Sequence, residues 1–270
     1  MFPYRVIEAE LLPEAWEKSI VEVWEHGIVI DSEYGERCKE ITALIVVKNP
    51  LKEPRYHLVG MLDGRLSTLE RYVREVIVGD ERMERGVKEG KEHYTYHERL
   101  FKYTVLDSKV VESEEEARKF KGVIKSFHGM YLVFYDRVIN QIEYIIEKLK
   151  KVPYSRRAVA ITWQPWKDEW ADYPPCLQLI QCRVIDGKLN MWVTMRSNDS
   201  FKASFFNMYA FTELQRYIAD RIGVEVGTYY HYATSYHIYE RDWKWVRSFV
   251  EKVKKGLSRR YWKRREELRF

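Results

Sequence analysis

The sequence has little cysteine and no long apolar run. Its three cysteines, Cys38, Cys176 and Cys182, form neither a dense nor an evenly paired set, so free thiols in a reducing compartment are expected. The longest apolar stretches, such as residues 41–47, are far too short to cross a bilayer, and no positively charged segment leads into an apolar one near the N-terminus. A soluble, cytoplasmic protein with no membrane role is therefore predicted.

Metal-binding patterns and interdomain linkers are also missing. Cys176 and Cys182 are six residues apart and no His-x-Glu precedes them, which argues against the zinc deaminase signature. The seven histidines are scattered, so no metal cofactor is expected. No stretch of Gly, Ser and Pro is long enough to separate two folding units, and a single domain over residues 1–270 is predicted.

The formal net charge of +5 is modest, but cations are concentrated near the C-terminus. Such a run could bind nucleic acid, or it could be the solvated face of a terminal helix. The helix is favoured and nucleic-acid binding is a minor alternative, because apolar residues recur along one stripe. The cations are Lys252, Lys254, Lys255, Arg259, Arg260, Lys263, Arg264, Arg265 and Arg269, and the stripe is Val246, Val250, Val253, Leu257 and Tyr261.

Apolar periodicity predicts a mixture of helices and strands, with a hairpin turn at Asp186-Gly187. Residues 80–91 are predicted to be a charged connector. The predicted fold class is α+β. The predicted helices cover residues 12–26, 69–78, 138–151 and 206–222, and the predicted strands cover residues 40–48, 157–163, 177–184, 189–195 and 228–235.

Cys176 is the candidate nucleophile. It follows two prolines that fix the backbone and precedes a predicted strand, so its thiol could face a cavity at the strand entrance. A thiolate attacks well only when cations lower its pKa, and Arg156, Arg157 and Arg196 are possible neighbours. Together with Ser197, these arginines would also form a phosphate-binding set. On its own, however, a cysteine is more often a small buried apolar residue.

A series of short motifs follows in order between residues 154 and 242. It comprises Ser-Arg-Arg at 155–157, Trp163, Pro-Cys at 175–176, Gln181, Arg-Ser-x-Asp at 196–199, Phe-Asn at 206–207 and His-x-Tyr at 237–239. In order and spacing, this series resembles the thymidylate synthase family. The resemblance implies a three-layer α+β fold, in which helices flank a mixed, largely antiparallel sheet and two copies dimerise through the sheet face.

The resemblance also implies a methyltransferase. The expected reaction converts dUMP to dTMP with 5,10-methylene-tetrahydrofolate, or a related methylene-tetrahydropterin, as the donor of carbon and hydride. The alternative is a pyrimidine nucleotide hydroxymethylase, in which water rather than hydride ends the reaction. Both reactions begin with a covalent bond between Cys176 and C6 of the pyrimidine.

The family pattern assigns the nucleotide site residue by residue. Arg196 and Ser197 would hold the 5′-phosphate, together with Arg156 and Arg157 of the partner subunit in an obligate homodimer. Asn207 would form hydrogen bonds with O4 and N3–H of uracil. A carboxylate at this position would instead favour cytosine. The alternative for Asn207 is a helix N-cap.

Other positions complete the site that the resemblance implies. His237 and Tyr239 would bind the sugar 3′-hydroxyl, Gln181 would steady the nucleotide, and Asp199 would accept hydrogen bonds from the pterin ring.

Within the first 150 residues the pattern is less complete. Glu75, before Gly79-Asp80, resembles the family's proton-relaying glutamate. Tyr96-His97 would replace the family's Tyr-Gly pair at the site, and Arg37 is the candidate for an N-terminal phosphate-binding arginine. Glu75 and Tyr96 could equally be helix-surface and core residues.

Several positions depart from the family pattern. Leu177 stands where a histidine usually follows the nucleophile, and Thr234 and Ser235 replace a glycine and an aspartate. The usual short apolar C-terminus is absent. These changes surround the donor rather than the nucleophile, as expected of an archaeal branch with a modified pterin.

Overall fold

A mixed seven-stranded sheet forms the centre of the computed structural model, which describes residues 1–268. Its strand order is β1-β3-β11-β10-β9-β8, with β2 paired to β3. The β1–β3 and β10–β11 pairs are parallel and the others are antiparallel. The strands are β1 (Tyr4–Ala9), β2 (Ile28–Asp31), β3 (Arg37–Val47), β8 (Val159–Ile161), β9 (Leu177–Ile185), β10 (Lys188–Asp199) and β11 (Glu225–Tyr239).

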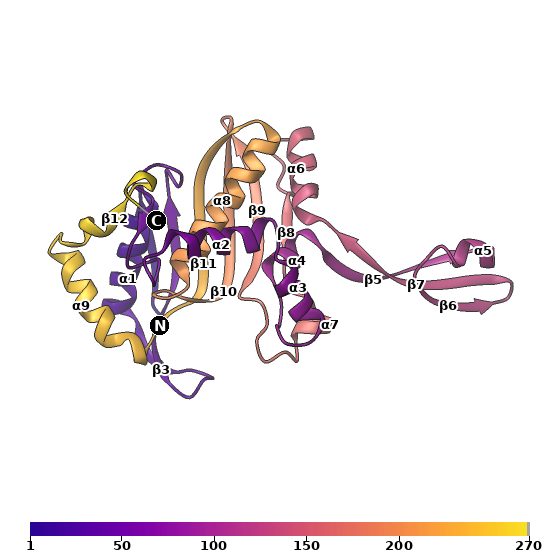
Figure 1. The fold of residues 1–270 in the computed structure, drawn as a ribbon, viewed down its shortest axis with the longest axis horizontal. Coiled ribbons are helices and arrows are strands. Elements are labelled where there is room, and N and C mark those ends of the chain that lie inside the picture. The colour runs from indigo at the N-terminus through magenta and orange to yellow at the C-terminus, as the bar shows by residue number, and fades with distance from the viewer. Residues whose placement is uncertain (269–270) are drawn as a thin grey trace.

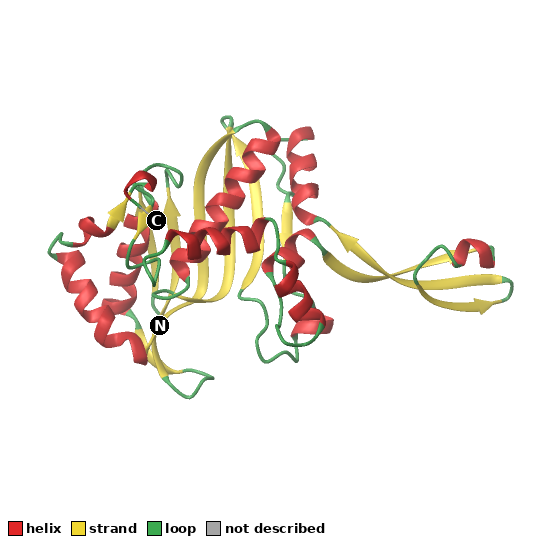
Figure 2. Ribbon diagram, viewed as in Figure 1, coloured by secondary structure: helices red, strands yellow, loops and turns green. Residues whose placement is uncertain are grey.

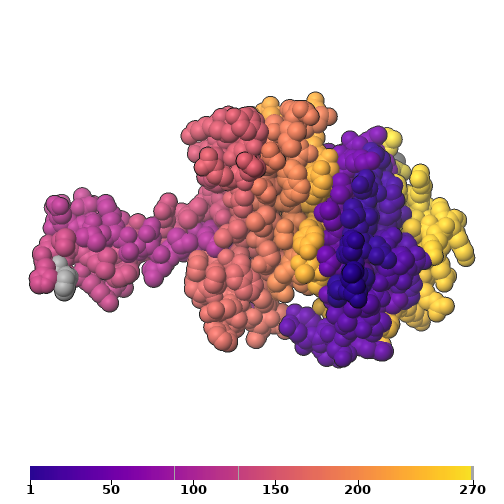
Figure 3. All heavy atoms as spheres, turned by 180° about the vertical axis from the view of Figure 1, so that it is seen from behind, coloured from indigo at the N-terminus to yellow at the C-terminus, as the bar shows by residue number. Residues whose placement is uncertain are grey.

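Helices cover one face of this sheet (Figures 1 and 2). The long α8 is buried along most of its length, because it packs against β10 and β11 on one side and α2 and α6 on the other. Seen from behind, orange segments from the second half of the chain lie at the surface beside the indigo N-terminal segments (Figure 3). The predicted α+β class, with a mixed sheet and flanking helices, is confirmed. These helices are α1 (Leu12–His26), α2 (Leu66–Ile77), α4 (Tyr96–Phe101), α6 (Gln141–Lys151) and α8 (Ser204–Ile222).

Several predicted bounds differ from the structure by a few residues, and at two places the type of element is wrong. The connector at 80–91 contains helix α3 (Glu81–Lys88), which begins where the Asp80 carboxylate accepts hydrogen bonds from two backbone N–H groups of the first turn. The helix predicted from residue 138 begins instead after Asn140, whose side chain accepts from the N–H of Glu143. Val138 extends the apolar pattern but belongs to strand β7 (Met130–Ile139).

A three-stranded arm, which no sequence pattern had indicated, extends from the β8 edge (Figure 1). It consists of β5 (Tyr103–Val111), β6 (Gly122–Phe127) and β7, with the short α5 (Glu114–Ala117) on one face. Its small core contains Val111, Ala117 and Val133, separate from the main hydrophobic cluster. The arm therefore has its own packing.

The basic C-terminal region packs against the body through helix α9 (Trp243–Lys254) and a short strand. Val246 and Val250 are buried as the helical stripe predicts, but the helix ends at Lys254 and leaves Leu257 exposed. Beyond the 3₁₀ turn η2 (Ser258–Tyr261), β12 (Trp262–Lys263) pairs with β4 (Tyr56–His57). Arg269 lies outside the described residues.

A buried carboxylate fastens this region to the first helix. Glu17 lies within hydrogen-bonding distance of His57 Nε2 at 2.9 Å, and accepts from Ser258 Oγ at 2.9 Å and Trp262 Nε1 at 2.8 Å. Three donors satisfy a charge that would be costly to bury alone. The remaining short elements are α7 (Pro165–Asp168), η1 (Glu240–Asp242) and η3 (Arg265–Glu267). No helix within residues 1–268 has the length and apolar character needed to cross a bilayer.

Candidate active site

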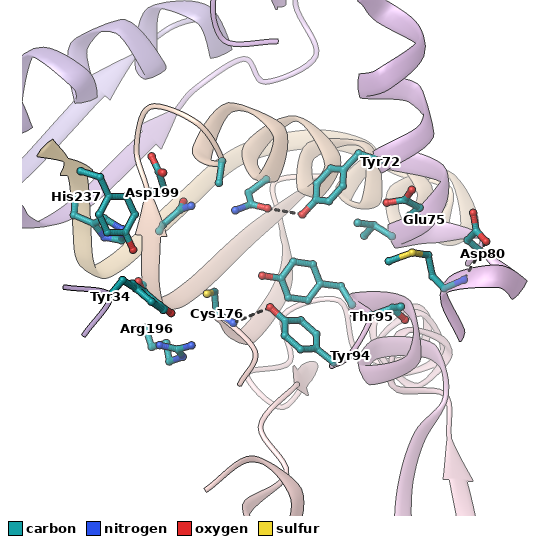
Figure 4. Close-up of a pocket in the computed structure, with 18 residues that line it drawn as sticks. Tyr34, Tyr72, Glu75, Asp80, Tyr94, Thr95, Cys176, Arg196, Asp199 and His237 are labelled. Carbon is teal, nitrogen blue, oxygen red and sulfur yellow. Dashed lines mark hydrogen bonds between the residues drawn. The ribbon is translucent and has the colours of Figure 1, made fainter. Parts of the chain in front are cut away.

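A cavity of about 400 Å³ lies between α2 and α8 and the ends of β10 and β11. Nine of the residues that the sequence singles out line it, although they come from distant parts of the chain (Figure 4). The cavity therefore brings together the candidate nucleophile, base reader and pterin-binding carboxylate. The nine are Glu75, Tyr96, Cys176, Arg196, Ser197, Asp199, Asn207, His237 and Tyr239.

Cys176 is held at the entrance to β9 by its neighbour strand. The Arg196 guanidinium donates to the carbonyl oxygens of Pro175 at 3.1 Å and Pro174 at 2.7 Å, and the Arg196 N–H donates to the Cys176 carbonyl. On the other side, the Tyr94 hydroxyl accepts from the Cys176 N–H at 3.4 Å. These contacts fix the backbone that carries the thiol.

The electrostatic surroundings of the thiol differ from the sequence expectation. Burial raises the pKa of Cys176, and Arg196 and the Tyr94 hydroxyl only partly offset this effect. Arg156 and Arg157 do not line the cavity. The thiol is therefore mainly protonated near neutral pH, and Arg196 is the cation that favours its thiolate.

Asn207 projects from the first turn of α8 and is almost fully buried. Its Oδ1 accepts a hydrogen bond of 2.6 Å from the hydroxyl of Tyr72 on α2 (Figure 4), and its Nδ2 lies 4.0 Å from Met195 Sδ. The side-chain amide thus faces the cavity rather than capping the helix.

Asp199 lies at the end of β10, where its Oδ1 accepts from the backbone N–H groups of Phe201 and Lys202. Burial raises the pKa of Asp199 to about 6, and nearby Asp242 adds to the shift, while the two hydrogen bonds oppose it. A desolvated carboxylate at a cavity wall fits a ligand that offers N–H donors.

His237 and Tyr239 alternate on β11, and their rings contact at 4.7 Å between centroids. His237 Nδ1 lies 3.1 Å from Ser235 Oγ, and burial lowers the pKa of His237, which keeps the ring neutral near pH 7. On the adjacent strand β10, Ser197 pairs with Ser235 and Asp199 pairs with His237. These groups form the wall of the cavity opposite Glu75 (Figure 4).

Comparison with known proteins agrees with this geometry. The family model described as thymidylate synthase matches residues 89–268, two thirds of the chain. The chain belongs to the thymidylate synthase family. A protein named "Putative thymidylate synthase" from Methanocaldococcus jannaschii is 33% identical over 261 residues, covering 93% of this chain and 98% of its own length. Proteins of the same name from Methanosarcina acetivorans and Methanosarcina barkeri are 30% and 29% identical, covering 94% and 92% of this chain and 96% of each relative.

Glu75, matched to the family's glutamate, lines the cavity but does not contact Asn207. Figure 4 places it beside Asp80, on the side away from Cys176. Burial raises the pKa of Glu75, and Arg71, whose Nε is 3.7 Å from its carboxylate, partly offsets the rise. The side chain of α2 that reaches Asn207 is Tyr72 instead.

Tyr94, just before α4, and Tyr96, its first residue, approach the nucleophile segment. Tyr94, not Tyr96, contacts the Cys176 N–H, while the Tyr96 hydroxyl accepts from the Leu177 N–H at 3.3 Å. Helix α4 is anchored by the buried Arg99, which makes two hydrogen bonds to Asp168 at 2.7 and 2.8 Å. Tyr96 therefore supports the strand entrance, and Tyr94 occupies the position nearest the nucleophile.

Four predicted residues lie outside the cavity. Arg37 forms an exposed ion pair with Glu240. Arg156 and Arg157 are exposed, and Gln181 donates to the Arg156 carbonyl at 2.8 Å rather than facing Cys176. Within one chain, only Arg196 of the predicted arginines reaches the nucleophile.

Sequence reasoning missed three aromatic residues of the cavity, Tyr34, Tyr72 and Tyr94. Tyr34 stacks on Tyr173 and contacts Tyr239, closing one wall. None of these three tyrosines belongs to a motif that the sequence reading used for the site. Among the described residues, no group of three or more His, Cys, Asp or Glu is placed to hold a metal ion.

Proposed function

We propose that this protein methylates dUMP to dTMP with a methylene-tetrahydropterin. The observation that carries the proposal is the convergence of Cys176, Arg196, Asn207 and Asp199 on one cavity. These residues supply a nucleophile, a cation, a base-reading amide and a carboxylate, which are the groups that the reaction needs. Reaction in the cytoplasm is part of the proposal, since the chemistry needs Cys176 as a free thiol.

The chemistry at the nucleotide begins with Cys176. Its thiolate, favoured by Arg196, forms a bond to C6 while the C5–C6 double bond opens, and the electron pair spreads over C5 and O4. Asn207 orients the ring by hydrogen bonds to O4 and N3–H. C5 thereby becomes nucleophilic.

Asp199 is the group that fits the pterin. Its carboxylate is partly buried, faces the cavity and has a raised pKa, so N–H donors of a bound ring would compensate its desolvation. When bound, a methylene-tetrahydropterin supplies the one-carbon unit and a hydride. Asp199 would hold the ring on the side of the cavity that includes His237 and Tyr239.

The decisive experiment measures tritium release from C5-labelled dUMP, UMP and dCMP, together with the absorbance change of pterin oxidation. Release from dUMP coupled to oxidation is expected, and Cys176→Ser should abolish it. Cys38→Ser, which alters a buried cysteine outside the cavity, is the matched control and should retain it. Release without oxidation would favour the hydroxymethylase, and no release from any nucleotide would contradict both enzymes.

The homodimer is also proposed, with Arg156 and Arg157 completing the phosphate site of the partner subunit. Their exposure and distance from the cavity of their own chain support this arrangement. Mixing Cys176→Ser protein with an Arg156→Ala/Arg157→Ala variant tests it. If the arginines act across the interface, mixed dimers contain one intact site and activity returns to about a quarter of the parent level. If they act within one chain, no activity returns.

A further inference from the structure

The hydrogen bond between Tyr72 and Asn207 bears on which base the cavity accepts. A side-chain amide has one acceptor and one donor end, and turning it by 180° exchanges them. In one orientation the amide matches the N3–H and O4 of uracil. In the other it matches the N3 and N4–H₂ of cytosine, so asparagine alone does not separate the two bases.

Two protein contacts oppose such a turn. The Tyr72 hydroxyl donates to Oδ1 at 2.6 Å, and Met195 Sδ, a weak acceptor, lies 4.0 Å from Nδ2. A turned amide would place Oδ1 against the sulfur, where neither atom can donate. It would also turn Nδ2 toward the Tyr72 hydroxyl, whose oxygen can accept from it, but the hydroxyl hydrogen would then lose its acceptor in the cavity wall, which is costly.

Tyr72 is a reliable donor. Burial raises its pKa far above the usual range, and the neighbouring Tyr94, Glu75 and Cys176 add to the shift, so the hydroxyl keeps its proton at every working pH. Asn207 itself is 6% exposed, so water cannot easily replace the hydroxyl. The amide is therefore held with one lone pair of Oδ1 and one hydrogen of Nδ2 unused by the protein.

We propose that Tyr72 is a specificity-determining positioning residue, which fixes the Asn207 amide in the orientation that accepts uracil and rejects cytosine. The inference rests on the proposed function, because it concerns the nucleotide of that same site. It assigns base selection to a pair of residues rather than to Asn207 alone. Loss of the hydroxyl removes the largest barrier to turning the amide.

Equilibrium binding of dUMP and dCMP to the full chain, measured by calorimetry without any pterin, tests this inference. The parent protein should bind dUMP more tightly than dCMP. Tyr72→Phe, which removes one oxygen and keeps the ring, should reduce this preference about tenfold, the change expected from one buried hydrogen bond. Met195→Leu should reduce it by a smaller factor, since a thioether is only a weak acceptor.

Tyr94→Phe is the matched control, because it removes a hydroxyl of the same cavity that does not contact Asn207. It should leave the ratio of the two affinities unchanged. An unchanged ratio in Tyr72→Phe, with unaltered circular dichroism, would overturn the inference and leave the proposed function intact. Failure of the parent protein to bind either nucleotide would instead contradict the proposed function, on which the inference depends.

Discussion

Replacing Asp199 with asparagine should stabilise the folded protein. The pKa of Asp199 is about 6 in the fold, against an ordinary value of 3.8. The folded state therefore binds this proton more tightly than the unfolded state, and keeping the carboxylate ionised costs stability above pH 6. The difference between these two pKa values corresponds to roughly 3 kcal/mol, and partial solvent access reduces the expected gain in stability to about 2 kcal/mol. Asparagine avoids this cost and still accepts from Phe201 and Lys202.

Urea unfolding at one fixed protein concentration measures the effect. At pH 7.5 the Asp199→Asn variant should exceed the parent by about 2 kcal/mol, and at pH 4.5 by less than half of that, since the parent's Asp199 is then largely protonated. Asp220→Asn, on the exposed side of α8, should change stability by less than about 0.5 kcal/mol. A variant less stable than the parent, or a gain independent of pH, would refute the reasoning. The same variant should lose affinity for the pterin.

Three further outcomes are expected. The rate of Cys176 alkylation, followed by mass spectrometry, should rise with pH, with a midpoint pH above that of a free cysteine. Arg196→Ala should move this midpoint to a higher pH, and an unchanged midpoint would contradict the role of Arg196. Glu17→Ala should lower the free energy of unfolding, measured by thermal denaturation, by about 3 kcal/mol, because three donors lose their acceptor. A decrease below about 1 kcal/mol would show that these hydrogen bonds do not stabilise the fold. Replacing arm residues 109–133 with Asn-Gly should leave the melting temperature nearly unchanged, because the main core contains none of them, and a large decrease would show that the arm supports the body.

Helix α1 was the most predictable element of the fold. Residues 12–26 form α1 as predicted, because its apolar residues recur every three or four positions up to Gly27. The end of α2 was also indicated, since Gly79 adopts a positive φ of 89° after the last turn. The start of α6 was misplaced because Val138, an apolar strand residue, continues the helical spacing backwards.

The site residues that belong to sequence motifs could be predicted. Those that reach the site only through packing between helices could not. The motif series located Cys176 and Asp199 in one cavity. It assigned Glu75 on α2, whereas packing of α2 against α8 brings Tyr72 to Asn207. Residues three positions apart share a helix face, and both Tyr72 and Glu75 line the cavity, so only the packing of the two helices decides which of the two side chains reaches Asn207.

The hydrogen bonds of Glu17 affect when the first helix can dock during synthesis of the chain. Glu17 is translated early, whereas its partners Ser258 and Trp262 follow 241 and 245 residues later. Until they emerge from the ribosome, His57 is the only one of the three donors available to the Glu17 carboxylate, so burying that carboxylate costs more and the docking of the first helix is weaker. A nascent chain stopped before residue 258 should therefore leave α1 exposed to proteases and chaperones, even though every residue of the cavity has already been made.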